Sequence, residues 1–295
     1  MKVLIAGGSG FLGAALSRRL HQQGHEAVIL TRQPARASSQ VQWDGRSMGP
    51  WVRVLEDVDA VVNATGYGLE HWPWLPVRKR QFVASRVDPG RVLAAASAEM
   101  HDPPRTFIQF SGTNYYGLSG EEPADEAAAA GTDFLAQLAV QWEAASRPVE
   151  EAGVRWVAAR NAVVLAASGG LLPLMALSTR MFLGGRLGSG RQPIPWIHLQ
   201  DQVAAILFLL GHDGANGPFN LVAPTPTRNA VFMKALAVAS RRPYWLPVPG
   251  AILRLALGGM AALILDGRVC VPKRLLDHGF RFTFPTIDDA LREIF

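Results

Sequence analysis

Three glycines near the start of the chain have a spacing that could bind a nucleotide. Gly7, Gly10 and Gly13 follow an apolar run at residues 3–6 and open a segment with helical periodicity at residues 11–24. Glycines at this spacing permit a tight turn, a close approach of the backbone to a pyrophosphate, and close packing of the helix on the strand. The free amide groups of the helix N-terminus would then bind the phosphates. We expect dinucleotide contacts from seven consecutive residues: Gly7, Gly8, Ser9, Gly10, Phe11, Leu12 and Gly13.

The end of the second predicted strand, residues 26–32, indicates which dinucleotide. Sites for NAD usually place Asp or Glu there, where the carboxylate holds the ribose 2′-hydroxyl. This chain has Thr31 and Arg32 instead, with Arg36 nearby. A guanidinium suits a 2′-phosphate, so we expect NADP(H) to be preferred over NAD(H). The alternative is that Arg32 is a solvated loop residue.

Two further segments could contact the adenosine half of the cofactor. Asp44 follows a third predicted strand and could accept a hydrogen bond from the adenine amino group, although Asp at such a position is more often a turn residue. The next predicted strand ends in a stretch whose backbone would line the same side: Asn63, Ala64, Thr65 and Gly66.

The elements around these residues alternate in type. Apolar strands are predicted at residues 2–7, 26–32, 58–66, 106–112 and 154–165, and helices at residues 11–24, 91–100 and 133–153. This order predicts an α/β fold, a Rossmann-type doubly wound parallel sheet with helices on both faces. We expect a Rossmann domain at residues 1–224, with residues 166–200 contributing to the substrate cleft. Residues 225–295 are expected to form a smaller C-terminal lobe on the substrate side.

Composition excludes several classes of site. A single cysteine, Cys270, permits no intrachain disulfide and no cysteine zinc cluster, and it fits a reducing, cytoplasmic location. The net charge is +5, but the longest basic run is Arg78–Arg80, so we expect no nucleic-acid partner. The histidines have no metal-binding spacing, because the one i, i+4 pair, His21 and His25, spans a predicted helix end.

Two other segments have a distinctive composition. Residues 251–265 are the most apolar stretch but include Arg254 and are too short to span a bilayer, so they predict a buried or amphipathic helix and no membrane partner. The acidic, alanine-rich residues 121–130 predict a solvated loop that leads into a helix.

Taken together, motifs over nearly the whole chain resemble the extended short-chain dehydrogenase/reductase superfamily. They include "GGSGFLG", "LTRQP", "DAVVNATG", "VRKRQFVASR", "YYG", "GGRLGSGRQPIPWIHLQD" and "PKRLLDHGFRF". The chain is most similar to an atypical, epimerase-like subfamily with a C-terminal domain of unknown function. The resemblance implies an NADP-type Rossmann domain, a small lobe covering the substrate cleft, and positions near the cofactor for Ser85 and Arg86.

The chemistry of this superfamily uses a Tyr that moves the substrate's hydroxyl proton, a Lys four residues later, and a Ser that orients the substrate oxygen. Residues at i and i+4 share a helix face, and the Lys charge favours the tyrosinate. Ser111 matches the Ser, with Thr113 as a second candidate, and it would lie against the cofactor. The Tyr–Lys pair is missing from the expected helix: Phe134 or Leu135 holds the first position, and Leu138 or Ala139 the second.

Other residues could take over the proton transfer. Tyr115 and Tyr116 follow the strand of Ser111 and could donate a proton or form a pocket wall, and Tyr67 is a further candidate. Lys79 could supply the missing cation or lie on a solvated helix face.

Candidates also lie in the second half of the chain. His198 could act as an acid or base, or be structural, while Asp201 is typical of a helix N-terminus. Arg186 and Arg191 could reach an anionic substrate or border a flexible loop.

These residues favour an NADP(H)-binding, epimerase- or oxidoreductase-like protein that acts on an unknown small metabolite, which could be anionic. The alternative is a non-catalytic NADP(H)-binding sensor or scaffold. We expect a monomer or homodimer.

Overall fold

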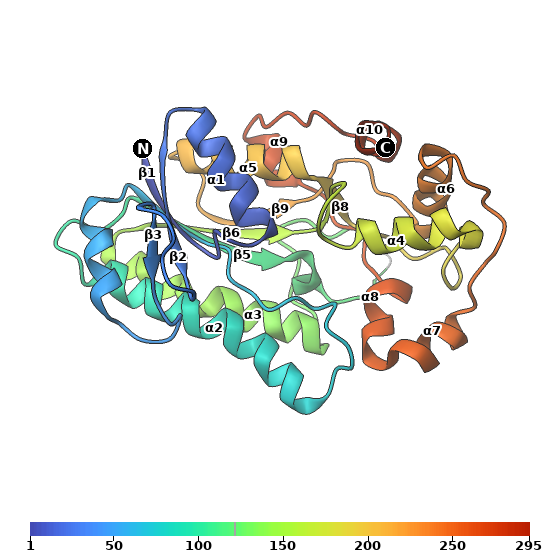
Figure 1. The fold of residues 1–295 in the computed structure, drawn as a ribbon, viewed down its shortest axis with the longest axis horizontal. Helices are drawn as coiled ribbons and strands as arrows, with labels where there is room; N and C mark the ends of the chain where they lie inside the picture. The colour runs from blue at the N-terminus through green and yellow to red at the C-terminus, as the bar shows by residue number, and fades with distance from the viewer. Residues whose placement is uncertain (121) are drawn as a thin grey trace.

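The computed structural model describes residues 1–120 and 122–295, and its centre is a seven-stranded sheet (Figure 1). The strands lie in the order β3–β2–β1–β4–β5–β6–β9, and neighbouring strands pair in parallel. They are β1 Lys2–Ala6, β2 Glu26–Thr31, β3 Gln40–Gln42, β4 Ala60–Asn63, β5 Thr106–Gly112, β6 Arg155–Asn161 and β9 Gly217–Leu221. The predicted α/β, Rossmann-type parallel sheet is confirmed.

Helices cover both faces of the sheet, and so its strands are continuous apolar runs. Helices α1 (Phe11–Gln22) and α5 (Leu199–Gly211) lie on one face, and α2 (Pro76–Ala98) and α3 (Phe134–Ser146) lie on the other (Figure 1). Alternate side chains of β1 enter the two cores, because successive residues of a strand point to opposite faces. Val3 and Ile5 pack with α1 and α5, whereas Leu4 and Ala6 pack on the α2 side. Short helices η1 (Pro50–Asp57) and η3 (Arg147–Ala152) complete this side.

The register of the sheet aligns the carboxyl ends of three strands. Ala6, the last residue of β1, pairs with Leu30 of β2 and with Asn63 of β4. Gly7, Thr31 and Ala64 therefore leave the sheet at the same level. In open α/β sheets this is the edge where ligands bind.

The predicted single strand at residues 154–165 is wrong, because the chain changes sheets at Ala162. Ala162 donates its backbone N–H to Leu221 of β9, whereas Val163 donates to Pro195. Residues Val163–Leu165 form β7, which pairs with β8 (Trp196–His198) in a separate two-stranded sheet. The apolar run continues through the break because both sheets are buried here.

A second core lies beyond this break. It joins Leu172 and Ala176 of α4 (Leu172–Ser178), Phe232 of α6 (Asn229–Ala239) and Leu291 of α10 (Ile287–Ile294). Helix η4 (Thr179–Leu183) continues α4. Helix α9 (Lys273–Asp277) instead returns to the main sheet, where Leu275 packs in the core on the α1 side.

Residues 251–265 do not form the predicted single helix. They form α7 (Gly250–Leu257), η5 (Gly258–Ala261) and α8 (Ala262–Leu265). Gly258 ends α7 with a φ of 53°, in the left-handed region that glycine adopts readily. Helix α7 contains no buried residue, whereas Ala261 of η5 is buried and α8 is half-buried, so the segment is buried only in part.

The prediction of a solvated loop at residues 121–130 is wrong for part of the segment. Residue 121 lies outside the described residues, but Ala124 and Glu126 are both buried. Ala124 exchanges backbone hydrogen bonds with Val269 and Val271, and Glu126 accepts one from the backbone N–H of Asn220. The segment is therefore held between the sheet and the C-terminal part of the chain.

Candidate active site

The glycine loop between β1 and α1 is packed too tightly for side chains. A Cβ on Gly7 would lie 2.6 Å from the carbonyl oxygen of Ala64, and one on Gly13 would lie 2.4 Å from that of Gly7. Gly7 also has a φ of 81°, and its carbonyl accepts the N–H of Gly10 at 3.0 Å. Gly7 is thus required by the backbone that follows β4, and Gly13 by close packing of α1 on the loop, as the glycine spacing predicted for the helix and strand.

The N-terminus of α1 leaves this loop with its amide groups available. Gly10 caps the helix without a side-chain hydrogen bond, and the first turn contains no acidic residue. Ser9 and Gly10 are exposed, while Phe11 and Leu12 are half-buried. Such a terminus combines unpaired N–H donors with the positive end of the helix dipole and suits an anion.

The end of β2 lies directly beside the glycine loop. Ile29 of β2 would be 2.8 Å from a Cβ on Gly8, and the strand ends two residues later at Thr31. Thr31 is buried and accepts the N–H of Gln33, while the Arg32 and Arg36 side chains are exposed. The adjacent Arg32 guanidinium is therefore accessible from the loop side of the sheet.

Asp44 is occupied by its own turn. Its carboxylate accepts hydrogen bonds from the N–H groups of Arg46 and Ser47 and from the Ser47 hydroxyl. The Ser47 hydroxyl, with these two amides, lowers the pKa of Asp44 to about 2. The turn interpretation of this residue accounts for its contacts within the protein.

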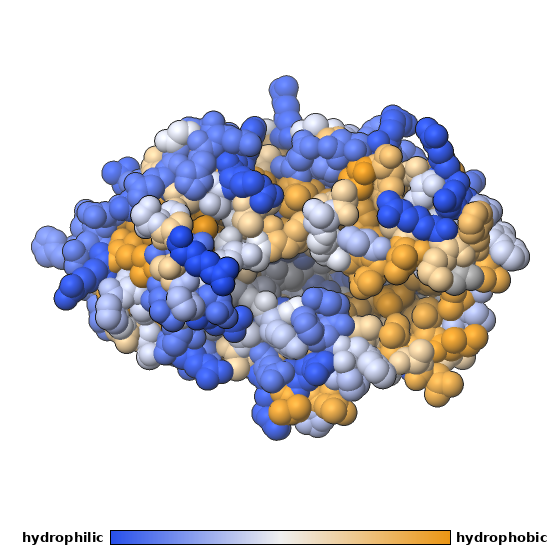
Figure 2. All heavy atoms as spheres, viewed as in Figure 1, coloured by the Kyte–Doolittle hydropathy of each residue, from blue (hydrophilic) through white to orange (hydrophobic). Residues whose placement is uncertain are grey.

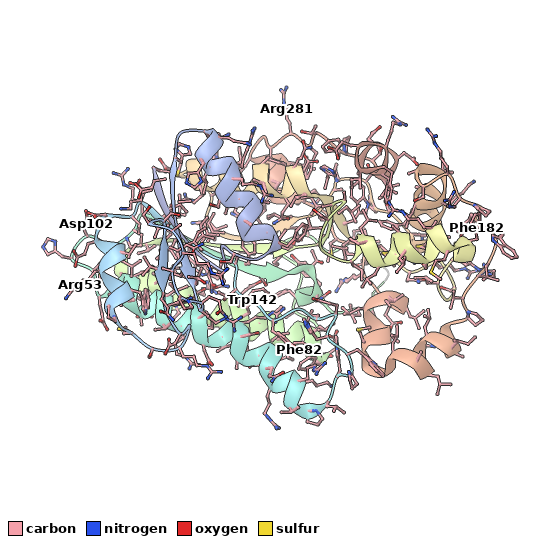
Figure 3. All side chains as sticks on the ribbon, in the orientation of Figure 1. Arg53, Phe82, Asp102, Trp142, Phe182 and Arg281 are labelled. Carbon is pink, nitrogen blue, oxygen red and sulfur yellow. The ribbon has the colours of Figure 1, made fainter. Side chains whose placement is uncertain are left out.

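Three side chains hold the loop that follows β4. Asn63 accepts from the backbone N–H and hydroxyl of Thr65, and Ser85 accepts from the N–H of Tyr67. The guanidinium of Arg86 donates to the carbonyl of Tyr67 and lies 4.8 Å from the Trp142 ring. Figure 3 labels Trp142 in this helical layer below the sheet.

Arg86 itself is inside the protein. Burial lowers its pKa to about 10, despite the opposing effect of Glu70. A Cβ on Gly66 would lie 3.2 Å from its guanidinium carbon. Asn63, Ser85 and Arg86 therefore hold the Ala64–Gly66 backbone in place from within.

Ser111 belongs to a buried network of charged and polar groups at the end of β5. Its hydroxyl donates to Glu143 of α3 at 2.7 Å, and Glu143 forms two hydrogen bonds with Arg160 of β6. Because the proton of Ser111 is directed to Glu143, only its lone pairs remain to interact with a ligand. Ser111, Glu143 and Arg160 are all less than one-tenth exposed.

Sequence reasoning missed Glu143 and Arg160. Each is the one charged residue in a mostly apolar stretch, "LAVQWEAA" for the first and "VAARNAVV" for the second. A charge within a segment predicted to be buried implies a partner, and that signal was present in the sequence. Burial works against the charge of Arg160, yet the contacts with Glu143 hold its pKa above its ordinary value.

The two neighbouring tyrosines differ in their surroundings. The hydroxyl of Tyr116 donates to Asn220 at 2.6 Å and accepts from Arg160 at 2.9 Å. Burial raises the pKa of Tyr116 above its ordinary value, against the effect of Arg160. Tyr115 is half-buried, and its ring centre lies 3.4 Å from the guanidinium carbon of Arg160. Both belong to helix η2 (Thr113–Tyr116), which also contains the buried Thr113.

The remaining candidate residues lie outside the network of Ser111, Glu143 and Arg160. The Lys79 ammonium lies 4.7 Å from the centre of the Phe134 ring and lines an open groove of about 430 Å³ between α2 and α3. Tyr67 stacks on His71 at 4.2 Å. Arg186 and Arg191 are exposed.

His198 and Asp201 connect β8 and α5 to the C-terminal residues. His198 contacts Glu293 at 2.9 Å and accepts the N–H of Gln200, and Asp201 accepts the N–H groups of Thr283 and Phe284. These contacts favour the structural interpretation of both residues.

The described residues contain neither a metal cluster nor a membrane-spanning helix. Within residues 1–120 and 122–295, no three His, Cys, Asp or Glu side chains come together as a metal site requires. Of the helices in that part of the chain, none is long and apolar enough to cross a membrane.

Comparison with known proteins identifies the family of this site. The sequence profile of the NAD-dependent epimerase/dehydratase family matches residues 3–221. The chain belongs to this family. A domain of unknown function, DUF1731, matches residues 248–294 of the same epimerase-family chain. The expected resemblance to extended short-chain dehydrogenases/reductases with such a C-terminal domain is confirmed.

Similar members of the epimerase family come from bacteria and mammals. Epimerase family protein Mb2239 of Mycobacterium bovis is 39% identical over 290 residues, which cover 98% of this chain and 96% of that protein. Human epimerase family protein SDR39U1 is 33% identical and covers 100% of this chain and 99% of its own length.

Solved structures of similar proteins share the fold of this chain. A crystal structure of human SDR39U1 with NADPH has a TM-score of 0.92 at 33% identity and covers 100% of this chain and 99% of that chain. UDP-glucose 4-epimerase from Thermus thermophilus, in complex with NAD, has a TM-score of 0.77. At 17% identity, over 100% of this chain and 97% of that one, it shows the shared fold alone.

Proposed function

We propose that this chain is an NADP(H)-binding, epimerase- or oxidoreductase-like enzyme acting on a small molecule. The observation that carries the proposal is the glycine cradle, in which Gly7 and Gly13 leave no space for a Cβ beside a helix N-terminus free of carboxylates. The human relative solved with NADPH supports the same cofactor here. When bound, the cofactor would supply hydride transfer, and the protein would supply orientation and a proton partner.

The choice of NADP(H) over NAD(H) rests on Arg32. Its exposed guanidinium follows a strand that packs on Gly8, and no carboxylate occupies the strand end. Arg36 lies close in sequence and adds a second positive charge. The proposed direct contacts are Gly7, Gly8, Ser9, Gly10, Phe11, Leu12, Gly13, Thr31, Arg32, Arg36, Ala64, Thr65 and Gly66. Asn63, Ser85 and Arg86 act through the loop that they hold, and Asp44 acts through its turn.

For proton transfer we assign the donor to Tyr115. Tyr116 is committed to Asn220 and Arg160, and the Lys79 ammonium lies over the Phe134 ring. The Arg160 guanidinium lies over the Tyr115 ring, 3.4 Å from its centre, and such a cation–π contact would hold the donor in place. Ser111 would accept a hydrogen bond from a substrate or cofactor donor, since its own proton goes to Glu143. Arg160 would thus be a positioning residue for Tyr115.

A second candidate function is a non-catalytic sensor or scaffold that binds NADP(H). It is favoured by one observation: α3 reads "FLAQLAVQWEAAS" and contains neither Tyr nor Lys. The two candidates share cofactor binding and differ in turnover, so a substrate-dependent change in NADPH absorbance distinguishes them.

The proposal includes the organisation of the protein. Residues 1–224 would form the cofactor domain, residues 225–295 the substrate-side lobe, and residues 166–200 part of the cleft between them. We propose a cytoplasmic monomer or homodimer that binds a small molecule and neither nucleic acid nor membrane.

A charge at the start of α1 tests the proposed cofactor site. Ser9 is exposed, and Ser9→Asp places a carboxylate at a helix N-terminus, where it does not destabilise the fold. We expect NADPH affinity, measured by fluorescence titration, to fall by about tenfold or more because of repulsion from the phosphates. Ser9→Ala, the matched control, should bind as the unaltered protein does. Unchanged binding in Ser9→Asp would overturn the proposed site.

A further inference from the structure

The C-terminal half of the molecule exposes a set of large apolar side chains that we call the apolar wall. Each is more than half exposed: Leu174, Leu177, Met181, Phe182, Trp245, Ile252 and Leu255. Leu255 is the most exposed of them, at 91%. Apolar residues gathered at this density on a surface usually mark a binding site, and an apolar helix such as α7 is normally covered.

The wall is one connected surface although its residues lie far apart in the sequence. The indole N–H of Trp245 donates to the carbonyl of Phe182, and Leu187 pairs with Val248 just before α7. Figure 3 shows Phe182 at the outer end of the α4–η4 segment, beside the chain that descends to α7. Figure 2 shows apolar residues over α4 and α7, along one side of the central hollow of the molecule.

The wall has two parts, one on α4 and η4 and the other on α7, and each begins at the candidate active site. Helix α4 starts two residues after Gly170, and the Phe11 ring of the cofactor loop would lie 2.5 Å from a Cβ on Gly169. On the side of α7 and α8, Leu263 packs against the same buried cluster as Tyr67, which follows the Ala64–Gly66 loop. The indole N–H of Trp72 also donates to the carbonyl of Leu257 at the end of α7. The apolar surface is therefore continuous with the carboxyl edge of the sheet.

Most charges around the wall are positive; an exception is Asp266, whose carboxylate lies 4.0 Å from the guanidinium of Arg254 on α7. The sequence has no Asp or Glu between Glu151 and Asp201, and none between Asp213 and Asp266. The wall therefore has arginines on it and beside it. Arg242 lies 4.9 Å from the Phe182 ring, and Arg180 and Arg186 are exposed on the η4 side. A ligand that fits this surface is apolar over most of its length and carries a negative charge.

We propose that the apolar wall binds the hydrocarbon chain of an anionic, single-chain amphiphile whose other end reaches the active site. This substrate class differs from a sugar nucleotide, which would require polar partners along its length. The inference rests on the proposed function only in treating the bound amphiphile as substrate. The binding itself needs no cofactor, so the two proposals fail separately.

A fluorescent fatty acid, dansyl-labelled undecanoate, is the probe for this surface. We expect saturable binding by the full chain without NADPH, at probe concentrations below micelle formation. The double variant Leu177→Gln/Leu255→Gln removes apolar contact at two exposed positions and should weaken binding by about tenfold or more. Leu276→Gln, at an exposed apolar residue on α9, is the matched control and should bind normally.

Comparing the fatty acid with its methyl ester tests the role of the negative charge on the ligand. Arg242→Ala should weaken binding of the fatty acid by about three- to fivefold and leave its methyl ester unaffected, as expected for an exposed ion pair. Arg281→Ala, at an exposed arginine that projects from the opposite side of the molecule in Figure 3, should change neither. Equal binding of acid and ester by the unaltered protein would overturn the anionic part of the proposal.

Three outcomes would overturn the proposal as a whole. One is absence of probe binding, and another is equal binding by the Leu177→Gln/Leu255→Gln variant. The third is sedimentation with anionic phospholipid vesicles, or dimerisation abolished by Leu255→Gln, without binding of the monomeric probe. An NADPH titration on the same samples reports separately on the cofactor site.

Discussion

The guanidinium of Arg160 binds the carboxylate of Glu143 through two parallel hydrogen bonds, 2.8 Å from Nε to Oε1 and 2.9 Å from Nη2 to Oε2. This pair joins β6 to α3 beneath the candidate active site. It receives the proton of Ser111 on one side and supports the ring of Tyr115 on the other. The ion pair thus connects Ser111 and Tyr115 to one buried group of charges.

Removing one partner of this ion pair should destabilise the folded protein. Arg160→Met leaves the Glu143 carboxylate buried without its partner, so we expect the free energy of unfolding in urea to fall by about 3–5 kcal/mol. Arg160→Met/Glu143→Gln removes both charges and should recover part of that loss. A double variant as destabilised as the sum of the two single variants would show that the two residues do not interact.

Variants of the two neighbouring tyrosines should differ, one affecting turnover and the other affecting stability. Tyr115→Phe removes the proposed proton donor and should lower turnover by about 100-fold or more, with NADPH affinity and melting temperature unchanged. Tyr116→Phe leaves the buried Asn220 Oδ1 and Arg160 Nη1 without the hydroxyl that each contacts and should lower stability by about 1–3 kcal/mol instead. Full turnover by Tyr115→Phe would remove Tyr115 from the mechanism.

Cys270 should be chemically inert in the folded protein. The residue is 4% exposed, and burial raises the pKa of its thiol to about 12. Because the thiolate is the reactive form, iodoacetamide at about pH 8 should label Cys270 only after unfolding. Mass spectrometry of native and denatured samples measures the labelled fraction, and rapid labelling of the native protein would contradict the burial of this residue.

His198 should contribute to the loss of stability in acid. Burial lowers its pKa below the ordinary 6.5, although Glu293 and Asp201 act in the opposite direction. The unfolded state therefore takes up this proton more readily than the folded state. The stability contribution of the neutral imidazole is present above about pH 6.5 and is lost as the pH falls through that value. His198→Gln should show a shallower decline in unfolding free energy between about pH 7 and pH 5 than the unaltered protein.

The sheet was predictable from sequence because strands buried on both faces are short apolar runs between helical segments. The same property concealed the break at Ala162. The N–H groups of Ala162 and Val163 bond to different sheets, although both residues belong to one apolar run. The Gly7–Gly13 loop was predictable because the spacing itself reflects backbone contacts.

Long-range partners were not predictable in this way. Glu143 and Arg160 lie 17 residues apart in the sequence, and Ser111 lies 32 residues from Glu143. Only the fold shows that the proton of Ser111 is already used. The exposure of α7 was equally hidden, because its composition is that of a core helix while its packing leaves it without a buried residue.

The central claim, that the glycine loop and Arg32 form a site selective for NADP(H), is tested most directly by titrating the purified protein with NADPH and with NADH. The account predicts that the unaltered protein binds NADPH about 10- to 150-fold more tightly, from about 1.5–3 kcal/mol for a charged hydrogen bond. Arg32→Ala should abolish that difference by weakening NADPH binding alone, while Arg53→Ala, at an exposed arginine on η1 labelled in Figure 3, should preserve it. Equal affinities in the unaltered protein, or unchanged NADPH binding in Arg32→Ala, would contradict the account.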